Sequence, residues 1–376
     1  MTSPGSAVSK YDPKLVVKLV ALTWLITKLI CYKLWLTDRL FPLIPVHSSL
    51  ADLPASVHIT LFIISLGSLL LLLLFPNRKL VVLLLAAELL SCMLDQDRWQ
   101  PWEYQFMFMM AAFAFIKDEK ETRFSWQLIL AGIYFFSGVS KFNSAFIHDV
   151  WQNLILHRWL GIYHTNVLIL RTGYALPLIE MAAGIFLLIN RTRRLAIPAL
   201  VLMHLLILVM LGPAGLNMNA VVWPWNVLMP VLLYVLFFRE AFQYSYFFSL
   251  KLFAWIVFVC WWILPWFQQA GYWDKYLSSV LYSGGVDQLY ICTGNELAKK
   301  EMAEYMDKEF KVIPCSPVLS VYKWGNKEMH TVPYPEKRVY NAIMKAWKKK
   351  YPGSNDRFYI YRSGFAYSVK EVFPAP

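Results

Sequence analysis

Long apolar runs, separated by short loops that carry basic residues, constrain this chain more than any other feature. Several runs approach the roughly 20 apolar residues that a helix needs to cross a bilayer. Hydrophobic residues make up 58% of the sequence and charged residues 16%, with a mean hydropathy of +0.45. The sequence therefore predicts a polytopic membrane protein.

The hydropathy pattern predicts an all-α membrane domain over residues 15–266, with about nine transmembrane helices. They are placed at Leu15–Leu36, Val57–Phe75, Leu80–Leu94, Pro101–Ile116, Trp126–Lys141, Gly173–Ile189, Leu195–Leu211, Val222–Phe238 and Phe247–Trp266. Several of these spans are short for about 30 Å of hydrocarbon, so two of them could be re-entrant. Residues 1–14 form a polar N-terminal tail.

The segment between Asn143 and Thr172 has an amphipathic pattern rather than a transmembrane one. Its apolar stripe consists of Trp151, Leu154, Ile155, Trp159 and Leu160. The pattern predicts an interfacial helix that lies along the membrane. A lid over a cavity near Lys141 is the functional alternative.

Basic loop residues are distributed unequally between the two sides of the predicted bundle. One side holds Lys10, Lys14, Arg78, Lys79, Lys117, Lys120, Arg123, Arg191, Arg193, Arg194 and Arg239. The other side holds Arg39, Arg98, Arg158 and Arg171. The positive-inside rule therefore predicts a cytoplasmic N terminus, and an odd number of spans places the C-terminal tail in a periplasm or lumen.

These loops and a basic tail account for the net charge of +12, so the charge does not indicate a nucleic-acid partner. The expected surroundings are membrane lipids. The sole glycosylation sequon, Asn190-Arg-Thr192, lies on the predicted cytoplasmic side. We therefore favour a bacterial inner membrane over an endoplasmic reticulum.

Residues 286–376 read as a small α+β domain outside the membrane, joined to the spans by a linker at 267–285. Strands are predicted at Asp287–Thr293, Pro317–Trp324 and Arg357–Arg362, and helices at Asn295–Phe310 and Glu336–Tyr351. Cys292 and Cys315 could form a disulfide in an oxidising compartment or stay free. The sequence has no metal-ligand spacing or phosphate-binding loop.

Lys141 lies at the outer end of the apolar run Trp126–Asn143, where a charged amine is costly. Such a lysine must snorkel to the interface, pair with a carboxylate or lose its proton. The neutral amine can act as a base. The simpler interpretation is an anchor at the end of a helix.

Further ionisable residues lie inside predicted spans. Glu180 could pair with Arg171 or with Lys141, either as a structural ion pair or as a catalytic one. His204 has a neutral form that a bilayer tolerates, so a hydrogen bond between helices is its simplest role. Glu88 lies in the middle of the third span.

The turn between the third and fourth spans concentrates polar and aromatic residues. It contains Asp95, Arg98, Trp99 and Tyr104. One interpretation is an interfacial turn with a belt of aromatic residues, and the other is a wall of a polar cavity.

The uncharged segment Leu211–Asn226 connects two apolar spans and is unusually polar. Its asparagines, Asn217, Asn219 and Asn226, can orient a carbonyl or quinol oxygen. Trp223 and Trp225 offer flat faces for a ring. Irregular backbone at this depth is tolerated where it lines a cavity or is buried in protein. A plain loop with an aromatic belt explains the segment as well.

Three of these segments, in this order, resemble the membrane domain of the vitamin K-dependent γ-glutamyl carboxylase family, also called the horizontally transferred transmembrane domain. They are Leu94-Asp95 with Trp99 and Tyr104, Tyr134-Phe-Phe-Ser-Gly-Val-Ser-Lys141, and Glu180-Met-Ala-Ala-Gly184. His204 has a counterpart in the next span. The general plan also looks like that of DoxX-like membrane proteins.

The resemblance implies that Lys141 is the base toward a vitamin K-type hydroquinone, with His204 and Glu180 beside it. The implied cofactor is reduced menaquinone or vitamin K, held by Asp95, Arg98, Trp99, Tyr104, Asn217, Asn219, Trp223 and Asn226. Ser140 and Trp102 depart from the family pattern. We therefore expect quinol chemistry with an acceptor other than glutamate.

The alternative function is that of a non-catalytic membrane subunit. In that case the bundle would bind a lipid or quinone, and residues 286–376 would dock a partner protein of a redox or secretion assembly. This alternative predicts that Lys141 is replaceable.

Overall fold

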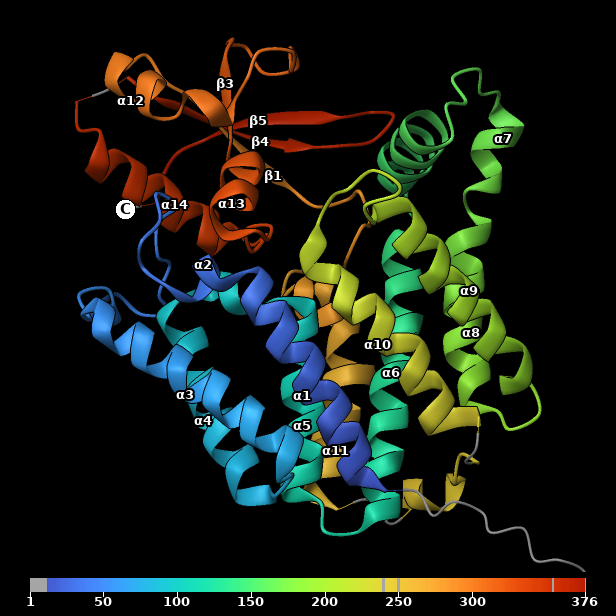
Figure 1. Cartoon of the computed structure of the whole chain (residues 1–376). Coiled ribbons are helices and arrows are strands. Elements are labelled where there is room, and N and C mark those ends of the chain that lie inside the picture. The colour runs from blue at the N-terminus through green and yellow to red at the C-terminus, as the bar shows by residue number, and fades with distance from the viewer. Residues whose placement is uncertain (1–11, 239–240, 249–250, 354, 376) are drawn as a thin grey trace, which may run out of the picture.

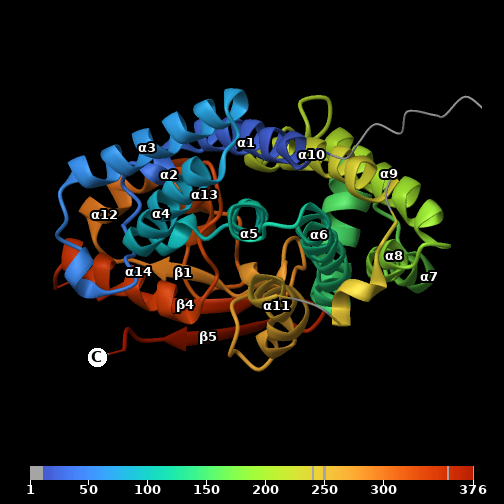
Figure 2. The same cartoon turned by 90° about the horizontal axis from the view of Figure 1, so that it is seen from below.

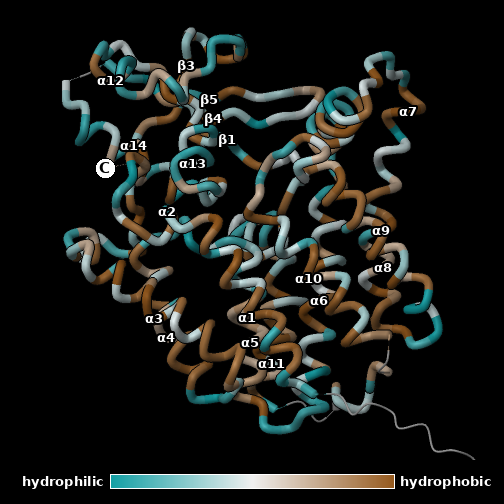
Figure 3. Tube along the Cα trace, viewed as in Figure 1, coloured by the Kyte–Doolittle hydropathy of each residue, from teal (hydrophilic) through white to brown (hydrophobic). Residues whose placement is uncertain are grey.

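A bundle of apolar helices carries a small α/β layer at one end (Figure 1). The computed structural model describes residues 12–238, 241–248, 251–353 and 355–375. Most of the predicted N-terminal tail and two topology markers, Lys10 and Arg239, lie outside the described residues. Hydrophobic residues dominate the bundle, and hydrophilic ones gather in the α/β layer and the connecting loops (Figure 3).

The bundle contains eleven α-helices in the described part of the chain. They are α1 Pro13–Ile30, α2 Tyr32–Trp35, α3 Ala55–Leu74, α4 Arg78–Leu94, α5 Pro101–Phe115, α6 Glu119–Lys141, α7 Val167–Thr172, α8 Ala175–Leu188, α9 Arg193–Leu211, α10 Trp223–Leu233 and α11 Leu252–Phe258. Figures 1 and 2 place α3 and α4 on one side of the bundle and α8 and α9 on the other.

Four helical segments are long and apolar enough to cross a membrane. They are Ala55–Leu74, Val167–Leu188, Arg193–Leu211 and Ala220–Phe238. The structure confirms a largely helical fold, and these four candidate membrane-spanning helices suggest a membrane protein. The remaining predicted spans overlap α1, α4, α5, α6 and α11, so a total of nine transmembrane helices stays a prediction.

Local sequence signals set several helix starts. The side chains of Asp12, Asn77 and Asp118 accept hydrogen bonds from backbone N–H groups in the first turns of α1, α4 and α6. Pro13 and Pro101 occupy first-turn positions, where a missing N–H costs nothing.

The predicted interfacial helix is shorter than expected. A π-helix covers Phe146–Trp159, and the chain then enters α7, which continues with α8 as one span of 22 residues. Asn166 caps this span by accepting a hydrogen bond from the Ile169 N–H at 2.9 Å. Helix α8 lies within the predicted sixth span Gly173–Ile189, and α7 extends this apolar segment back to Val167.

Helices α6 and α8 pack very closely through two glycines. A Cβ on Gly138 would lie 2.6 Å from the Met181 nitrogen, and one on Gly184 would lie 2.6 Å from the Phe135 nitrogen. Small residues allow such backbone approach between membrane helices. This contact aligns the C-terminal end of α6 with the middle of α8.

The C-terminal layer is an antiparallel sheet with the order β2-β3-β1-β4-β5. Its elements are β1 Gln288–Cys292, α12 Glu296–Glu301, β2 Met306–Asp307, β3 Val318–Ser320, α13 Val321–Met329, α14 Lys337–Lys350, β4 Arg357–Arg362 and β5 Ser368–Val372. The structure confirms the first and last predicted strands and the second helix. It also pairs Cys292 with Cys315 in a disulfide.

Two predicted elements of this layer are wrong in extent, and β5 was not predicted. The helix expected at Asn295–Phe310 ends at Glu301, and the chain then forms β2. The strand expected at Pro317–Trp324 ends at Ser320, because the Ser320 side chain accepts a hydrogen bond from Lys323 N–H and starts α13.

The C-terminal layer is fixed to the turn between α4 and α5. The Tyr334 N–H donates to Asp97 Oδ1 at 2.7 Å, and Arg338 Nε donates to Gln96 Oε1 at 2.7 Å. Gln100 Nε2 donates to the Val332 carbonyl at 3.0 Å. The turn therefore acts as a docking platform for the layer rather than as a free loop.

Asp97 is fully buried in this docking contact. Burial and the neighbouring charge of Asp95 raise the pKa of Asp97 to about 7, although Arg39 and the Tyr334 N–H act in the opposite direction. The folded protein thus holds a proton that the unfolded chain releases near pH 4. Stability from this group is present at low pH and is lost as pH rises toward 7.

We therefore predict that the Asp97→Asn variant loses stability less steeply than the wild type between about pH 4 and pH 7. One titrating proton gives at most about 1.4 kcal/mol for each pH unit. Thermal unfolding in detergent at several pH values measures the difference. The control is Asp52→Asn, at an exposed position. Parallel pH profiles for wild type and Asp97→Asn would contradict the prediction.

Candidate functional site

A buried polar cluster joins α6, α8, α9 and α10. Lys141 Nζ donates to Glu180 Oε2 at 2.6 Å and to Ser137 Oγ at 2.8 Å. The side chains of Lys141 and Glu180 are 15% and 8% exposed. Of the predicted alternatives for Glu180, the structure selects the pair with Lys141. The lysine is held by a partner rather than extended freely toward the interface.

A chain of neutral hydrogen bonds lies next to this pair. Tyr134 OH is 2.8 Å from His204 Nε2, and His204 Nδ1 is 2.8 Å from Asn226 Oδ1. Asn226 uses its amide nitrogen to donate to the Val222 carbonyl at 2.8 Å, so its oxygen must accept from His204. His204 therefore carries its proton on Nδ1 and accepts one hydrogen bond, from Tyr134, on Nε2.

The helical repeat explains why these groups meet. Tyr134, Ser137 and Lys141 have the spacing i, i+3 and i+7, which places them on one face of α6. The charges of Glu180 and Lys141 act on His204, so the ion pair and the neutral chain form one site. We call these six residues the Lys141 cluster: Tyr134, Ser137, Lys141, Glu180, His204 and Asn226.

The structure does not bring Asp95 and Arg98 to the Lys141 cluster. Asp95 forms an ion pair with Arg39. Arg98 donates hydrogen bonds of 2.9–3.1 Å to Leu34, Trp35, Ser91 and His58. These contacts join α2, α3 and α4, so Asp95 and Arg98 stabilise the helix ends, and their role as cofactor ligands stays a prediction.

Trp99 and Tyr104 belong to the same region as Asp95. Tyr104 is buried and stacks on Trp261, with ring centroids 4.7 Å apart. Trp99 packs partly buried against the core beside the docking turn. This packing gives both residues a structural role, and a bound ring beside them stays a prediction.

The asparagine-rich segment is divided between two roles. Asn226 belongs to the Lys141 cluster, whereas Asn217 and Asn219 adopt positive φ angles of 46° and 53° and shape the turn after α9. The Asn219 side chain contacts the Tyr282 hydroxyl in the linker. Trp223 Nε1 donates to the Met218 carbonyl at 3.2 Å and so closes the same turn.

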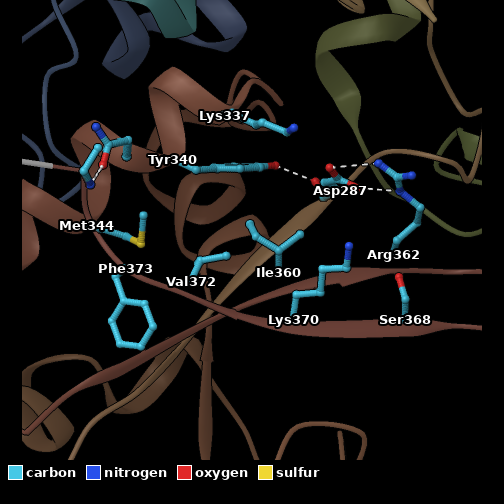
Figure 4. Close-up of a pocket in the computed structure, with 12 residues that line it drawn as sticks. Asp287, Lys337, Tyr340, Met344, Ile360, Arg362, Ser368, Lys370, Val372 and Phe373 are labelled. Atoms are coloured by element: carbon cyan, nitrogen blue, oxygen red, sulfur yellow. Dashed lines mark hydrogen bonds and ion pairs between the residues drawn. The ribbon is translucent and has the colours of Figure 1, made fainter. Parts of the chain in front are cut away.

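A separate hollow of about 450 Å³ lies in the C-terminal layer, between α14 and strands β4 and β5 (Figure 4). Arg362 holds Asp287 with hydrogen bonds of 2.6 and 3.1 Å. Lys337 and Lys370 add two more positive charges to the lining. Ile360, Met344 and Val372 provide its apolar part. The hollow suits an anionic group on an apolar body.

Sequence reasoning missed several buried polar residues. Tyr134 lies within the motif that contains Lys141 but was given no role. Lys28 and Glu103 lie inside predicted spans and were also overlooked, although a charge inside an apolar helix is itself a functional signal. Among the described residues, no group of three or more His, Cys, Asp or Glu is placed to bind a metal.

We predict that Glu180→Leu alone destabilises the protein, because it leaves the Lys141 ammonium without its buried partner. The cost should approach the lower end of about 3–5 kcal/mol, since the pair keeps some solvent contact. The double variant Lys141→Met/Glu180→Leu should recover most of the loss. Thermal and denaturant unfolding in detergent measure both effects.

The matched control is Glu296→Leu, which removes an exposed partner of Lys299 and should change stability by less than about 0.5 kcal/mol. If the stability losses of Lys141→Met and Glu180→Leu, each measured alone, simply add in the double variant, the two side chains do not stabilise each other and the prediction is contradicted.

Comparison with known proteins assigns no family. No protein-family model, curated protein or solved structure matches this chain. The resemblance to the carboxylase-like membrane domain therefore stays a prediction, and the function has to be argued from the geometry of the Lys141 cluster.

Proposed function

We propose that this chain is a membrane protein that binds a reduced quinone at the Lys141 cluster and removes a proton from its hydroxyl group. The observation that carries the proposal is the pair of Lys141 and Glu180, which is mostly buried but still reachable. A hydroquinone would supply an acidic hydroxyl on an apolar ring. Its most suitable source in a bacterial inner membrane is menaquinol.

The donor set of the cluster fits such a group. A lysine ammonium has three N–H bonds, and Ser137 and Glu180 use two of them. The third can donate to a ligand oxygen. A charged hydrogen-bond donor within a mostly apolar bundle suits a ring with a hydroxyl.

The ion pair can accept a proton without creating an isolated buried charge. Glu180 accepts the proton as a carboxylate, and Lys141 keeps its positive charge to hold the anion that remains. The pair is neutral before the transfer, and the pair with the bound anion is neutral afterwards. In this proposal Glu180 is the base and Lys141 binds the anion, whereas the sequence predicted Lys141 as the base.

The neutral hydrogen-bond chain of Tyr134, His204 and Asn226 supports the proton transfer, because it fixes the polar groups next to the ion pair. Tyr134 and His204 lie where the charges of the pair act on them, and Asn226 fixes the imidazole. A fixed imidazole keeps the polar groups next to the ion pair in one arrangement. The closely packed α6 and α8 exclude water from the same face, which strengthens every electrostatic interaction there.

Glutamate carboxylation is not part of this proposal. Ser140 donates to the Ser137 carbonyl at 2.9 Å, and Trp102 is buried against Phe106 with ring centroids 6.2 Å apart. Both residues depart from the carboxylase pattern and are satisfied structurally. The substrate that reacts after the proton transfer is therefore not a glutamate side chain.

A second candidate function is partner docking by residues 286–376. The cation-lined hollow of Figure 4 favours it, because Lys337, Lys370 and the exposed Phe373 line the same hollow. An acidic segment with an apolar side chain would complement this surface. This candidate leaves the Lys141 cluster as a structural ion pair.

Purified protein in nanodiscs should bind reduced short-chain menaquinone and promote its oxidation under oxygen. Glu180→Gln should lower the rate by about 100-fold or more, because the proton acceptor is lost. Lys141→Met/Glu180→Leu should also be inactive while remaining folded. Absorbance of the quinone measures turnover, and mass spectrometry identifies the product.

The matched control is Lys251→Ala, which removes a largely exposed lysine from an ion pair with Glu121. Equal turnover in all variants would contradict the proposal. Docking would be favoured instead by two results together: the protein binds no quinol, and it binds a stable protein partner that the Lys337→Glu/Lys370→Glu variant no longer binds.

A further inference from the structure

A second group of buried charges comes from α1, α4 and α5, helices that lie apart from α8 and α9 in Figure 2. Lys28 of α1, Glu88 of α4 and Glu103 of α5 are each 0% exposed. Lys28 Nζ donates to Glu88 Oε2 at 2.8 Å, and Trp24 Nε1 donates to Glu103 Oε2 at 2.7 Å. Ser65 Oγ donates to the other oxygen of Glu88.

The hydrogen bonds of this group leave one position without a donor. Glu88 and Glu103 lie around the same lysine, because Lys28 binds Glu88 and its Nζ lies 5.8 Å from the centroid of the Trp24 ring that donates to Glu103. Glu103 Oε1 has no donor among the described residues. Two ionised carboxylates cannot donate hydrogen bonds, and like charges close together repel. A proton on one of the two carboxylates removes this repulsion.

The charges of the group lead to the same result. Glu88 and Glu103 oppose the single ammonium of Lys28, so full ionisation would leave one uncompensated negative charge. A buried charge of this kind is costly unless it is paired or neutralised. One bound proton makes the group neutral.

Neighbouring charged groups do not compensate the excess negative charge of Glu88 and Glu103. Arg98 and Arg39 lie toward the docking turn, where they face Asp95 and Asp97, so that above about pH 7, where Asp97 is ionised, two positive groups oppose two negative ones. The hydrogen bonds of Arg98 go to α2, α3 and α4 and not to Glu103.

The other described neighbours that we consider, one aromatic ring and two thiols, add no further carboxylate to the group. From α2, the ring of Trp35 lies under Lys28, with Nζ 2.9 Å from its centroid. The thiols of Cys31 and Cys92 also lie near the group, where Lys28 acts on both.

We propose that Glu88 and Glu103 share one bound proton, so that Lys28, Glu88 and Glu103 form a buried proton-binding site. The site is independent of the proposed quinol chemistry, since it uses other helices. Its three charged groups come from α1, α4 and α5. Release of the proton leaves a net negative charge between these helices, so the occupancy of the site is linked to their packing.

Infrared spectroscopy of the purified protein in detergent at pH 8 tests the site, because Asp97 is ionised above about pH 7. The wild type should show the carbonyl band of a protonated carboxylic acid. Glu103→Gln or Glu88→Gln should lose this band. The control Glu309→Gln, at an exposed position, should keep it.

Absence of the band from the wild type, or its survival in both buried variants, would overturn the proposal. Thermal unfolding gives a second readout, in case Glu88→Gln fails to fold without a counterion for Lys28. Glu103→Gln should keep the wild-type midpoint, because the amide replaces a neutral acid of similar shape. A large fall in this midpoint would show instead that Glu103 is needed as a carboxylate.

Discussion

Burial of charge among apolar helices is the constraint on which this structure depends. The described bundle places Lys28, Glu88, Arg98, Lys141 and Glu180 where water cannot solvate them freely. Each is therefore matched by a partner from another helix or from a helix end, and these contacts set which helices lie side by side. The apolar surface drives the chain into the membrane, and the charged groups determine its internal arrangement.

The two halves of the bundle shield their charged groups from solvent to different extents. In the α3–α4 half, the charges are fully enclosed and lie beneath the docked C-terminal layer. In the α8–α9 half, the Lys141 cluster keeps a small exposed fraction, and the glycine contacts of α6 and α8 hold its groups in register. The first set of charges is therefore closed to solvent, whereas the second keeps limited solvent contact.

Sequence reasoning found the parts that depend on local pattern. Hydropathy indicated the helices, and the charge in an apolar run identified Lys141, with Glu180 among its predicted partners. The position of Asp95 and Arg98 could not be read in this way, because it depends on carbonyls of residues 34 and 35 and on His58 in α3. The placement of Glu88 and Glu103 around Lys28 and Trp24 and the strand β5 likewise depend on tertiary packing that hydropathy does not encode.

The most direct test of the account is photo-crosslinking of a photoreactive menaquinol analogue to the protein in nanodiscs, followed by peptide mapping. The account predicts labels on α6 between Tyr134 and Lys141 and on α8 near Glu180. Excess menaquinol should compete for these labels, and Lys141→Met/Glu180→Leu should abolish them. Labels spread over the lipid-facing helices, or unchanged in the double variant, would contradict a quinol site at the Lys141 cluster.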